Sequence, residues 1–250
     1  MNAIILAAGE GTRLRPETIS IPKGMVKLFD KSLLEMQIDV FKKCGINDIS
    51  IVTGYLADKI TFPSINYFKN ENYSSTAGNE SIFCAKEKLQ DCTIITYGDL
   101  VFEKAVIDQV INFKGDIGIA VDLDWEKNYV NRDQHPKSEA ENVLINGNEI
   151  LEIRKNISEC KKNEKIGECP GLVKFSRKAS KVFLDKYSEL EISHQGKFHN
   201  APSLEKALIS DMIQELIDSE INVEPIYVSG KWCEIDTPQD LEIARKIFEE

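Results

Sequence analysis

The feature that most constrains this chain is an apolar run, residues 3–8, that ends abruptly in a glycine-bracketed turn, residues 9–11. The run has the length and composition of a fully buried strand. The two glycines leave the main chain free to bend and open to a ligand, and successive N–H groups in such a loop can form an anion-binding nest. Arg13 and Lys23 follow and supply positive charge suited to phosphate. This stretch therefore predicts a site for a small polyanion, such as a nucleotide triphosphate.

The glycine loop taken alone also fits an ordinary strand and turn. The dinucleotide fingerprint G-x-G-x-x-G needs a third glycine where this chain has Leu14, and the G-K-[ST] of a P-loop is absent. Charge supports the anion site, because residues 1–27 hold four Lys/Arg against two Glu, which leaves +2 in a chain whose net charge is -10. That acidic total argues against nonspecific binding of nucleic acid, which needs a basic face.

Length and composition predict one domain over residues 1–250. The six cysteines never occur in C-x-x-C spacing, so neither zinc nor thioredoxin-like chemistry is indicated. No run approaches the roughly 20 apolar residues of a membrane span, and residues 3–8 are too short for a secretory signal and lack a basic segment before them. We therefore expect a cytoplasmic protein with reduced cysteines and no nucleic-acid or membrane partner, and leave a homodimer open.

The first half of the chain alternates apolar runs with amphipathic segments. Residues 31–44 predict a helix that stops at Gly45, and residues 48–55 predict a second buried strand. Strand, glycine loop, helix and strand form the pattern of a right-handed parallel βαβ unit. Further strands are expected at 65–68, 93–97 and 117–123, and a helix at 80–89. This order predicts an α/β fold with a mostly parallel, Rossmann-like central sheet flanked by helices.

The second half changes character. Residues 124–141 are polar and charged and predict a loop or lid, and residues 142–153 carry an Asn-Gly turn between apolar runs, which predicts a hairpin. We therefore expect a small hairpin and lid insertion in the fold. The remaining expected elements are a solvated loop at 157–165, strands at 171–176 and 223–236, helices at 178–187 and 204–217, and a terminal helix with Thr237 as N-cap and Pro238 at its first position.

Two aspartates stand where ligands gather in such folds, beyond the carboxyl ends of strands. Asp99 directly follows a buried strand, where a carboxylate needs a metal or a Lys/Arg partner. Asp236 lies just before the terminal helix, in W-C-E-I-D-T-P-Q-D-L. From the pattern alone, either could be an ordinary turn residue.

These motifs together resemble the signature of the sugar-nucleotide and cytidylyltransferase superfamily. The string L-A-A-G-E-G-T-R-L-R-P, followed by P-K-G-M, fits its pattern L-A-A-G-x-G-[TS]-R-[LM]-x-P followed by P-K, and W-x-E-[IV]-D-T-x-x-D-L is a further family feature. The resemblance implies an Mg²⁺-dependent nucleotidyltransferase in which Asp99 and Asp236 hold Mg²⁺ on the triphosphate. Arg13 would hold the departing phosphates, and Lys23 would lie by the α-phosphate and the incoming anion.

The chain resembles the small cytidylyltransferases of the phosphocholine and phosphonate-pathway type most closely. Three segments carry this likeness: N-x-x-Y-x-x-T at 70–76, R-x-x-H-P-x-S-E-A-E at 132–141 and G-E-x-P-G-L at 167–172. The likeness implies transfer of a cytidylyl group from CTP to a small phosphonate or phosphorylated alcohol, with release of pyrophosphate. The acceptor would resemble 2-aminoethylphosphonate, hydroxyethylphosphonate or phosphocholine.

One departure keeps alternatives open. Ala77-Gly78 stands where those enzymes often carry Asn-Met, so UTP or dTTP and a sugar-1-phosphate acceptor stay open. A nucleotide-binding regulatory subunit without catalysis is an alternative of another class. The presence of Arg13, Lys23, Asp99 and Asp236 together weighs against it.

The expected site has four groups of residues. Arg13 and Lys23 are the expected catalytic residues, and Asp99 and Asp236 the expected Mg²⁺ ligands. The residues expected at the nucleotide are Leu6, Ala8, Gly9, Gly11, Thr12, Arg13, Lys23, Gly54, Tyr55, Ser75, Thr76, Ala77 and Gly98. For the acceptor, Arg132, Lys155 and Lys174 could hold its anion and Glu80 or Glu168 an ammonium group, although each fits a surface charge at least as well.

Overall fold

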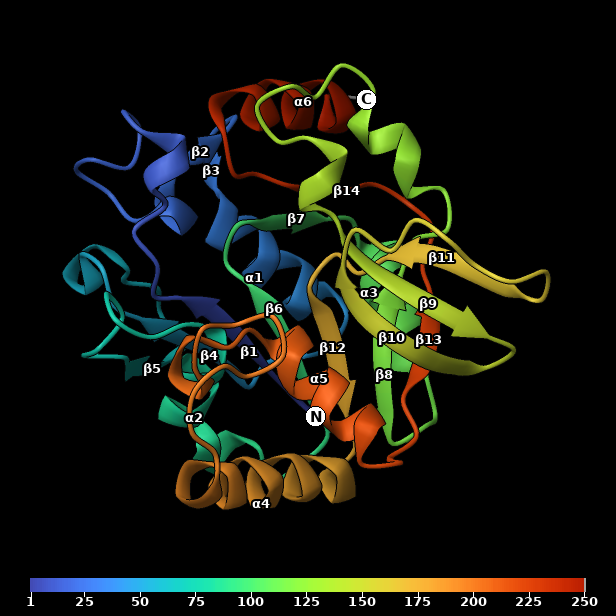
Figure 1. Cartoon of the computed structure of the whole chain (residues 1–250). Helices are drawn as coiled ribbons and strands as arrows, with labels where there is room; N and C mark the ends of the chain where they lie inside the picture. The colour runs from blue at the N-terminus through green and yellow to red at the C-terminus, as the bar shows by residue number, and fades with distance from the viewer. Residues whose placement is uncertain (250) are drawn as a thin grey trace.

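The computed structural model describes residues 1–249 and is built around a seven-stranded sheet (Figure 1). Its strands are β1 (Asn2–Ala7), β4 (Ile49–Thr53), β5 (Asn66–Lys69), β6 (Thr93–Tyr97), β8 (Ile117–Val121), β12 (Leu172–Phe175) and β13 (Glu224–Tyr227). They lie in the order β13-β8-β12-β6-β1-β4-β5, and β12 runs antiparallel to both its neighbours while the other pairs are parallel. This arrangement confirms the predicted mostly parallel α/β fold.

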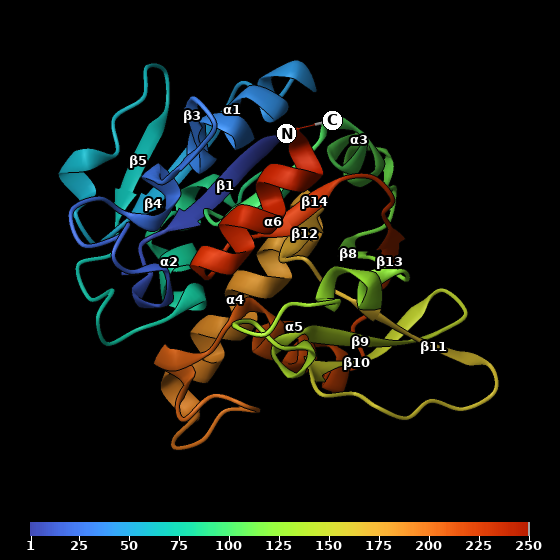
Figure 2. The same cartoon turned by 90° about the horizontal axis from the view of Figure 1, so that it is seen from above.

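Helices cover both faces of the central sheet. They are α1 (Leu33–Lys43), α2 (Gly78–Cys84), α3 (Lys104–Asn112), α4 (Arg177–Ser193) and α5 (Ile209–Asp218). Helix α6 (Pro238–Phe248) packs instead in a third core, with Leu14 and Val26. Successive strand residues face opposite ways, so Ala3 and Ile5 pack in one core with α1 and α3, while Ile4 and Leu6 pack in a second core with α2, α4 and α5. Figure 2 shows α1 and α3 on one side of the sheet and α4 and α5 on the other.

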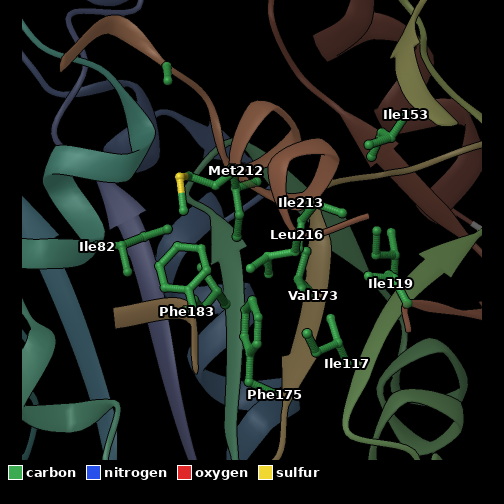
Figure 3. Close-up of a cluster of buried hydrophobic side chains, with 14 of the residues drawn as sticks. Ile82, Ile117, Ile119, Ile153, Val173, Phe175, Phe183, Met212, Ile213 and Leu216 are labelled. Atoms are coloured by element: carbon green, nitrogen blue, oxygen red, sulfur yellow. The ribbon is translucent and has the colours of Figure 1, made fainter. Parts of the chain in front are cut away.

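Helix α5 is fixed on the sheet by close apolar packing. Figure 3 shows its Met212, Ile213 and Leu216 against Val173 and Phe175 of β12. Burying a side chain of this size contributes about 1.5–3 kcal/mol. The start of α5 is therefore held rigidly beside the start of β12.

Three smaller sheets complete the fold. They are β10-β9-β11, formed by β9 (Glu141–Asn146), β10 (Glu149–Lys155) and β11 (Glu164–Glu168); β14-β7, formed by β7 (Leu100–Phe102) and β14 (Trp232–Glu234); and β2-β3, formed by β2 (Lys27–Leu28) and β3 (Lys31–Ser32). The predicted hairpin is confirmed as β9 and β10, joined at Gly147 with φ +61°. The predicted loop at 157–165 is wrong at its end, because β11 begins at Glu164 and pairs with β9. β11 is an edge strand made mostly of charged residues, with Ile166 between them, so its composition resembled that of a solvated loop.

The predicted strand at 223–236 is wrong, because the segment divides between two sheets. β13 joins the central sheet and β14 pairs with β7. The chain turns between them at Gly230, where φ is +120° and a Cβ would lie 2.5 Å from the Glu103 carboxylate. The amide of Ile235 then donates to the carbonyl of Asp99 at 3.0 Å. This turn therefore brings the end of β14 beside the end of β6.

The polar segment 124–141 is less exposed than a lid would be. It contains two 3-10 helices, Trp125–Tyr129 and Lys137–Glu139, and it buries Arg132 and His135. These polar groups are buried because Arg132 bonds to His135, to the carbonyl of Glu234 and to Asp240 in the first turn of α6, a pairing that composition does not reveal. Within residues 1–249, no helix combines the length and apolar character that crossing a bilayer requires.

Several helix boundaries also differ from expectation. The helix predicted at 80–89 is the shorter α2 followed by a 3-10 turn at Lys86–Lys88, and α4 extends beyond the predicted 178–187. The terminal helix is confirmed: Thr237 caps α6 through its hydroxyl, which accepts from the amide of Asp240 at 3.3 Å, with Pro238 in the first turn. Helix α3 and strand β7 were not predicted.

Candidate active site

The glycine loop after β1 is shaped by close contact with Lys23. Gly11 has φ +62°, and a Cβ there would lie 2.8 Å from the Cβ of Lys23. The Thr18 hydroxyl donates to the Gly11 carbonyl at 2.8 Å and fixes the loop from the other side. Only glycine accepts both the positive φ and the close approach of Lys23, so the lysine stem lies directly against the main chain of the loop.

Lys23 joins the two aspartates that the sequence placed at strand ends. Its Nζ donates to Asp99 Oδ2 at 2.6 Å and also to Asp236 Oδ1. Arg13 Nη2 donates to Asp236 Oδ2 at 2.6 Å. The side chains of Lys23 and Asp236 are 12% and 6% exposed, so the ion pair between them is largely shielded from water. Residues 99 and 236 therefore converge on one point, as predicted from their positions at strand ends.

The charges of this cluster support one another. Burial by itself would lower the pKa of Lys23, but the Asp99 and Asp236 carboxylates outweigh it and hold that pKa above its ordinary value. Burial would likewise raise the pKa of Asp236, but Lys23 and Arg13 outweigh it and hold that pKa below its ordinary value. Lys23 and Asp236 are therefore both held in their charged forms at neutral pH.

A cavity of about 320 Å³ opens beside the glycine loop. Residues expected at the nucleotide or metal that line it are Leu6, Ala8, Gly9, Gly11, Thr12, Arg13, Lys23, Thr76, Ala77, Gly98, Asp99 and Asp236. Lining residues outside that expected set are Ala7, Gly24, Asn70, Tyr73, Gly78, Ser81, Tyr97 and Leu208. Asn70 and Tyr73 belong to the N-x-x-Y-x-x-T motif, which was the signal that could have found them. This first cavity lies at the carboxyl ends of β1 and β6.

Three residues expected at the nucleotide do not line this cavity. Tyr55 donates its hydroxyl to the Ile19 carbonyl at 3.0 Å. Gly54 packs so closely that a Cβ would lie 2.7 Å from Tyr73, and the exposed Ser75 donates its hydroxyl to a neighbouring main-chain carbonyl. In this structure these residues support the surrounding loops.

A second cavity, of about 220 Å³, adjoins the first. The two share five lining residues, which are Arg13, Tyr97, Asp99, Leu208 and Asp236. The second cavity extends from there between the hairpin, the start of β12 and the start of α5, with an apolar floor that includes Ile153 and Ile213. The Arg13–Asp99–Asp236 cluster therefore stands at the junction of two compartments.

Two of the residues expected at the acceptor line this second cavity. Lys155 Nζ lies 2.6 Å from Glu139 Oε2, and buried Glu168 accepts a hydrogen bond from the Tyr129 hydroxyl. Glu80 and Lys174 lie outside both cavities.

Glu80 and Lys174 have partners elsewhere in the fold. Glu80 accepts from the Tyr187 hydroxyl. Lys174 Nζ donates at 2.7 Å to the carbonyls of Ile111 and Phe113, at the end of α3. Neither is brought near Arg13 and the aspartates.

Arg132 was expected at the acceptor because of its positive charge, but it lies behind Asp236 and lines neither cavity. Its Nε donates to Asp240 Oδ1 at 2.6 Å, and the two side chains are 4% and 0% exposed. Its Nη2 donates to the Glu234 carbonyl at 2.9 Å. Asp240 Oδ2 in turn accepts from the amide of Asp236 at 3.0 Å. The Arg132–Asp240 pair therefore fixes the main chain that carries Asp236.

His135 also contributes to this cluster. Its Nδ1 lies 3.1 Å from Arg132 Nη2 and 3.5 Å from Oδ2 of both Asp236 and Asp240. Its Nε2 lies 3.7 Å from Glu234 Oε2. His135, Glu234 and Asp236 offer polar atoms within 4.8 Å of one another. Because both ring nitrogens face polar groups of the protein, the histidine serves this cluster as a hydrogen-bonding group.

The sequence of residues 3–130 matches the family described as the MobA-like NTP transferase domain. The chain is 32% identical over 254 residues to "CTP:phosphoglutamine cytidylyltransferase" of Campylobacter jejuni subsp. jejuni serotype O:2, covering 97% of this chain and 98% of that protein. It is 39% identical over 107 residues to "Choline-phosphate cytidylyltransferase" of Streptococcus pneumoniae, covering 41% of this chain and 47% of that protein.

Solved structures agree with the fold. The CTP:phosphocholine cytidylyltransferase from Streptococcus pneumoniae superposes with a TM-score of 0.72 at 23% identity, covering 98% of each chain. The inositol-1-phosphate CTP transferase from T. maritima gives a TM-score of 0.73 at 20% identity, covering 99% of this chain and 96% of that one. At these sequence identities, the structural likeness shows the fold alone. The family match and the relative that spans nearly the whole chain show that this protein belongs to the MobA-like NTP transferase family, as its motifs predicted.

Proposed function

We propose that this protein transfers a cytidylyl group from CTP to a small phosphonate or phosphorylated alcohol and releases pyrophosphate. The observation that carries the proposal is the convergence of Arg13, Lys23, Asp99 and Asp236 where two cavities meet. A nucleotide beside the glycine loop and a small acceptor in the second cavity would meet at this junction. The cytidylyltransferase names of the relatives support CTP as the donor.

The chemistry asks little of a general base. An oxygen of the acceptor's phosphoryl group is already ionised and attacks the α-phosphorus, forming a new P–O bond while the bond to the pyrophosphate oxygen breaks. The protein must then position the two anions and neutralise their charge. Lys23 would lie by the α-phosphate and the incoming oxygen, and Arg13 would hold the departing phosphates.

The donor set at the junction fits Mg²⁺. Asp99 and Asp236 both reach one ammonium group, so their carboxylates converge on a single point. Carboxylate oxygens are the ligands that Mg²⁺ prefers, whereas His135 offers a ring nitrogen already engaged by Arg132. Asp99 and Asp236 would hold the ion, and a bound Mg²⁺ supplies charge neutralisation on phosphate oxygens.

A sugar-1-phosphate uridylyl- or thymidylyltransferase is the second candidate, because of Ala77 and Gly78. A Cβ at Gly78 would lie 3.0 Å from the Tyr97 hydroxyl, so this rim of the first cavity needs a small residue. With small residues at this rim, no large side chain there selects between cytosine, uracil and thymine.

The test offers CTP, UTP, dTTP, ATP and GTP with Mg²⁺ against small phosphonates, phosphocholine and sugar-1-phosphates, and follows pyrophosphate release. We expect CTP with a small phosphoryl acceptor to give the fastest turnover. Faster turnover with UTP or dTTP and a sugar-1-phosphate would establish the second candidate. Nucleotide binding without release from any pair would identify a regulatory subunit.

A further inference from the structure

The second cavity is strongly acidic. Its lining carboxylates are Asp99, Glu139, Glu141, Glu168, Glu234 and Asp236. Arg13 and Lys155 are the permanent cations that line it. A compartment for an anionic acceptor would be expected to have the opposite balance, because like charges repel strongly at short range.

Only some of these carboxylates form ion pairs with lysine or arginine side chains of the site. Asp99 and Asp236 bond to Lys23 and Arg13, as described above, and Glu139 bonds to Lys155. Among residues 1–249, no lysine or arginine nitrogen lies within 4.0 Å of Glu141, Glu168 or Glu234. Two buried cations of this region are already engaged, Lys23 with Asp99 and Asp236 and Arg132 with Asp240.

The uncompensated carboxylates differ in what they can reach. Glu168 is 3% exposed and already accepts from the Tyr129 hydroxyl. Glu234 lies beside His135 at the junction where the phosphoryl group would sit. Glu141 is half-buried at the start of β9, on the hairpin side of the cavity and without an ion-pair partner.

Burial raises the pKa of Glu141 to about 7. The loss of solvation outweighs the Ser210 hydroxyl and the charge of Lys155, which both act to lower this pKa, and Lys155 itself is paired with Glu139. A cationic ligand at Glu141 would supply the missing charge.

We infer that the acceptor carries a positively charged nitrogen at the end away from its phosphoryl group, and that Glu141 recognises it. The inference rests on the proposed function and narrows it to amine-bearing acceptors. The apolar floor formed by Ile153, Ile209 and Ile213 suits the short carbon chain between the two charged ends. A neutral hydroxyl or a sugar in the same place would leave the cavity's excess negative charge uncompensated.

The experiment compares two acceptors that differ mainly in charge, 2-aminoethylphosphonate and 2-hydroxyethylphosphonate, each with CTP and the full chain. We expect the amine to be favoured about 10- to 100-fold in kcat/KM, the range of one charge-assisted hydrogen bond. Glu141→Gln should remove most of that preference and leave the hydroxyl acceptor almost unaffected. The matched control is Glu149→Gln, which makes the same charge change on an exposed residue of the same hairpin and should keep the preference.

Each outcome decides the inference. Equal use of the hydroxyl acceptor or of glucose-1-phosphate by the wild-type protein would overturn it and leave the proposed function standing. Equal slowing of both phosphonates by Glu141→Gln, or loss of preference in Glu149→Gln, would overturn the role of Glu141. Efficient use of phosphocholine would support the inference with a quaternary cation.

The proposed function can fail separately. If no combination of nucleotide and acceptor led to release of pyrophosphate, that function would be wrong. Calorimetric titration of the two phosphonates into the CTP-loaded protein would still decide the inference, because it measures preference for the cation without turnover.

Discussion

Replacing Glu141 by Gln should stabilise the fold above pH 7 even though it weakens the proposed acceptor site. Burial raises the pKa of this carboxyl group from its ordinary 4.5 to about 7. The unfolded chain releases the proton near its ordinary pKa, whereas the folded protein keeps it until about pH 7. A group with a raised folded pKa favours the folded state while it is protonated. Wild-type stability should therefore fall as pH rises from about 4.5 to about 7.

The size of the effect follows from the two pKa values. A difference of about 2.5 units corresponds to about 3.4 kcal/mol at 1.36 kcal/mol per unit. Because the Glu141 side chain is only half-buried, water relaxes part of this penalty, and we expect about 1–2 kcal/mol. Glutamine carries no charge at any pH and avoids the penalty.

Urea denaturation of both proteins at roughly pH 4.5 and pH 8 measures the effect. The free energy of unfolding of Glu141→Gln, relative to wild type, should rise between the two conditions by about 1–2 kcal/mol. Loss of any pH-independent hydrogen bond cancels in this comparison, and Glu168 titrates in the same range in both proteins. The exposed Glu149→Gln control should show no such rise. A difference between variant and wild type that is the same at both pH values would refute the reasoning.

Three further changes test the junction. Lys23→Ala should lower turnover at saturating nucleotide far more than it weakens nucleotide binding in a titration, because its charge acts most strongly in the transition state; intact turnover with lost affinity would contradict this. Asp99→Asn and Asp236→Asn should each remove most of the pyrophosphate release, and the double variant should cost little more than the worse single one; full activity in Asp236→Asn would end this assignment. Arg132→Met should lower the free energy of unfolding by about 3–5 kcal/mol, because it leaves buried Asp240 without its cation; a loss below about 1 kcal/mol in urea denaturation would show that the pair is dispensable.

The parts of the fold that depend on local chemistry could be predicted from the sequence. The apolar run at residues 3–8 is a central strand, and the terminal helix begins at the cap formed by Thr237 and Pro238. In these two cases the signal lies in a few neighbouring residues. Asp99 and Asp236 were also expected to converge, and they do, but for a different reason: β14 pairs antiparallel with β7 outside the central sheet, and the amide of Ile235 bonds to the carbonyl of Asp99.

The acceptor side depended on pairings that local sequence does not carry. Lys174 was expected at the acceptor for its charge, yet it is buried and needs acceptors of its own, which the end of α3 supplies. Arg132 was expected there for the same reason and instead pairs with Asp240, 108 residues away. Glu141 ends a polar stretch and is the last residue of the R-x-x-H-P-x-S-E-A-E motif, but the motif does not say which way its side chain faces. Only the pairing of β9 with its neighbours turns it toward the cavity.

At the junction, the charges of two cations and two carboxylates balance one another, and a bound nucleotide would change that balance. Two carboxylates this close would repel each other, and Lys23 and Arg13 cancel their charge in the protein alone. The same two cations cannot serve the aspartates and a triphosphate at full strength together. If Lys23 and Arg13 turn to the phosphates, Asp99 and Asp236 are left in need of a new cation, and their oxygens are suited to a divalent one. We therefore expect nucleotide and metal to bind together, with each weakening in the absence of the other. This mutual dependence explains why a lysine near the start of the chain and two aspartates far apart along it should act as one unit.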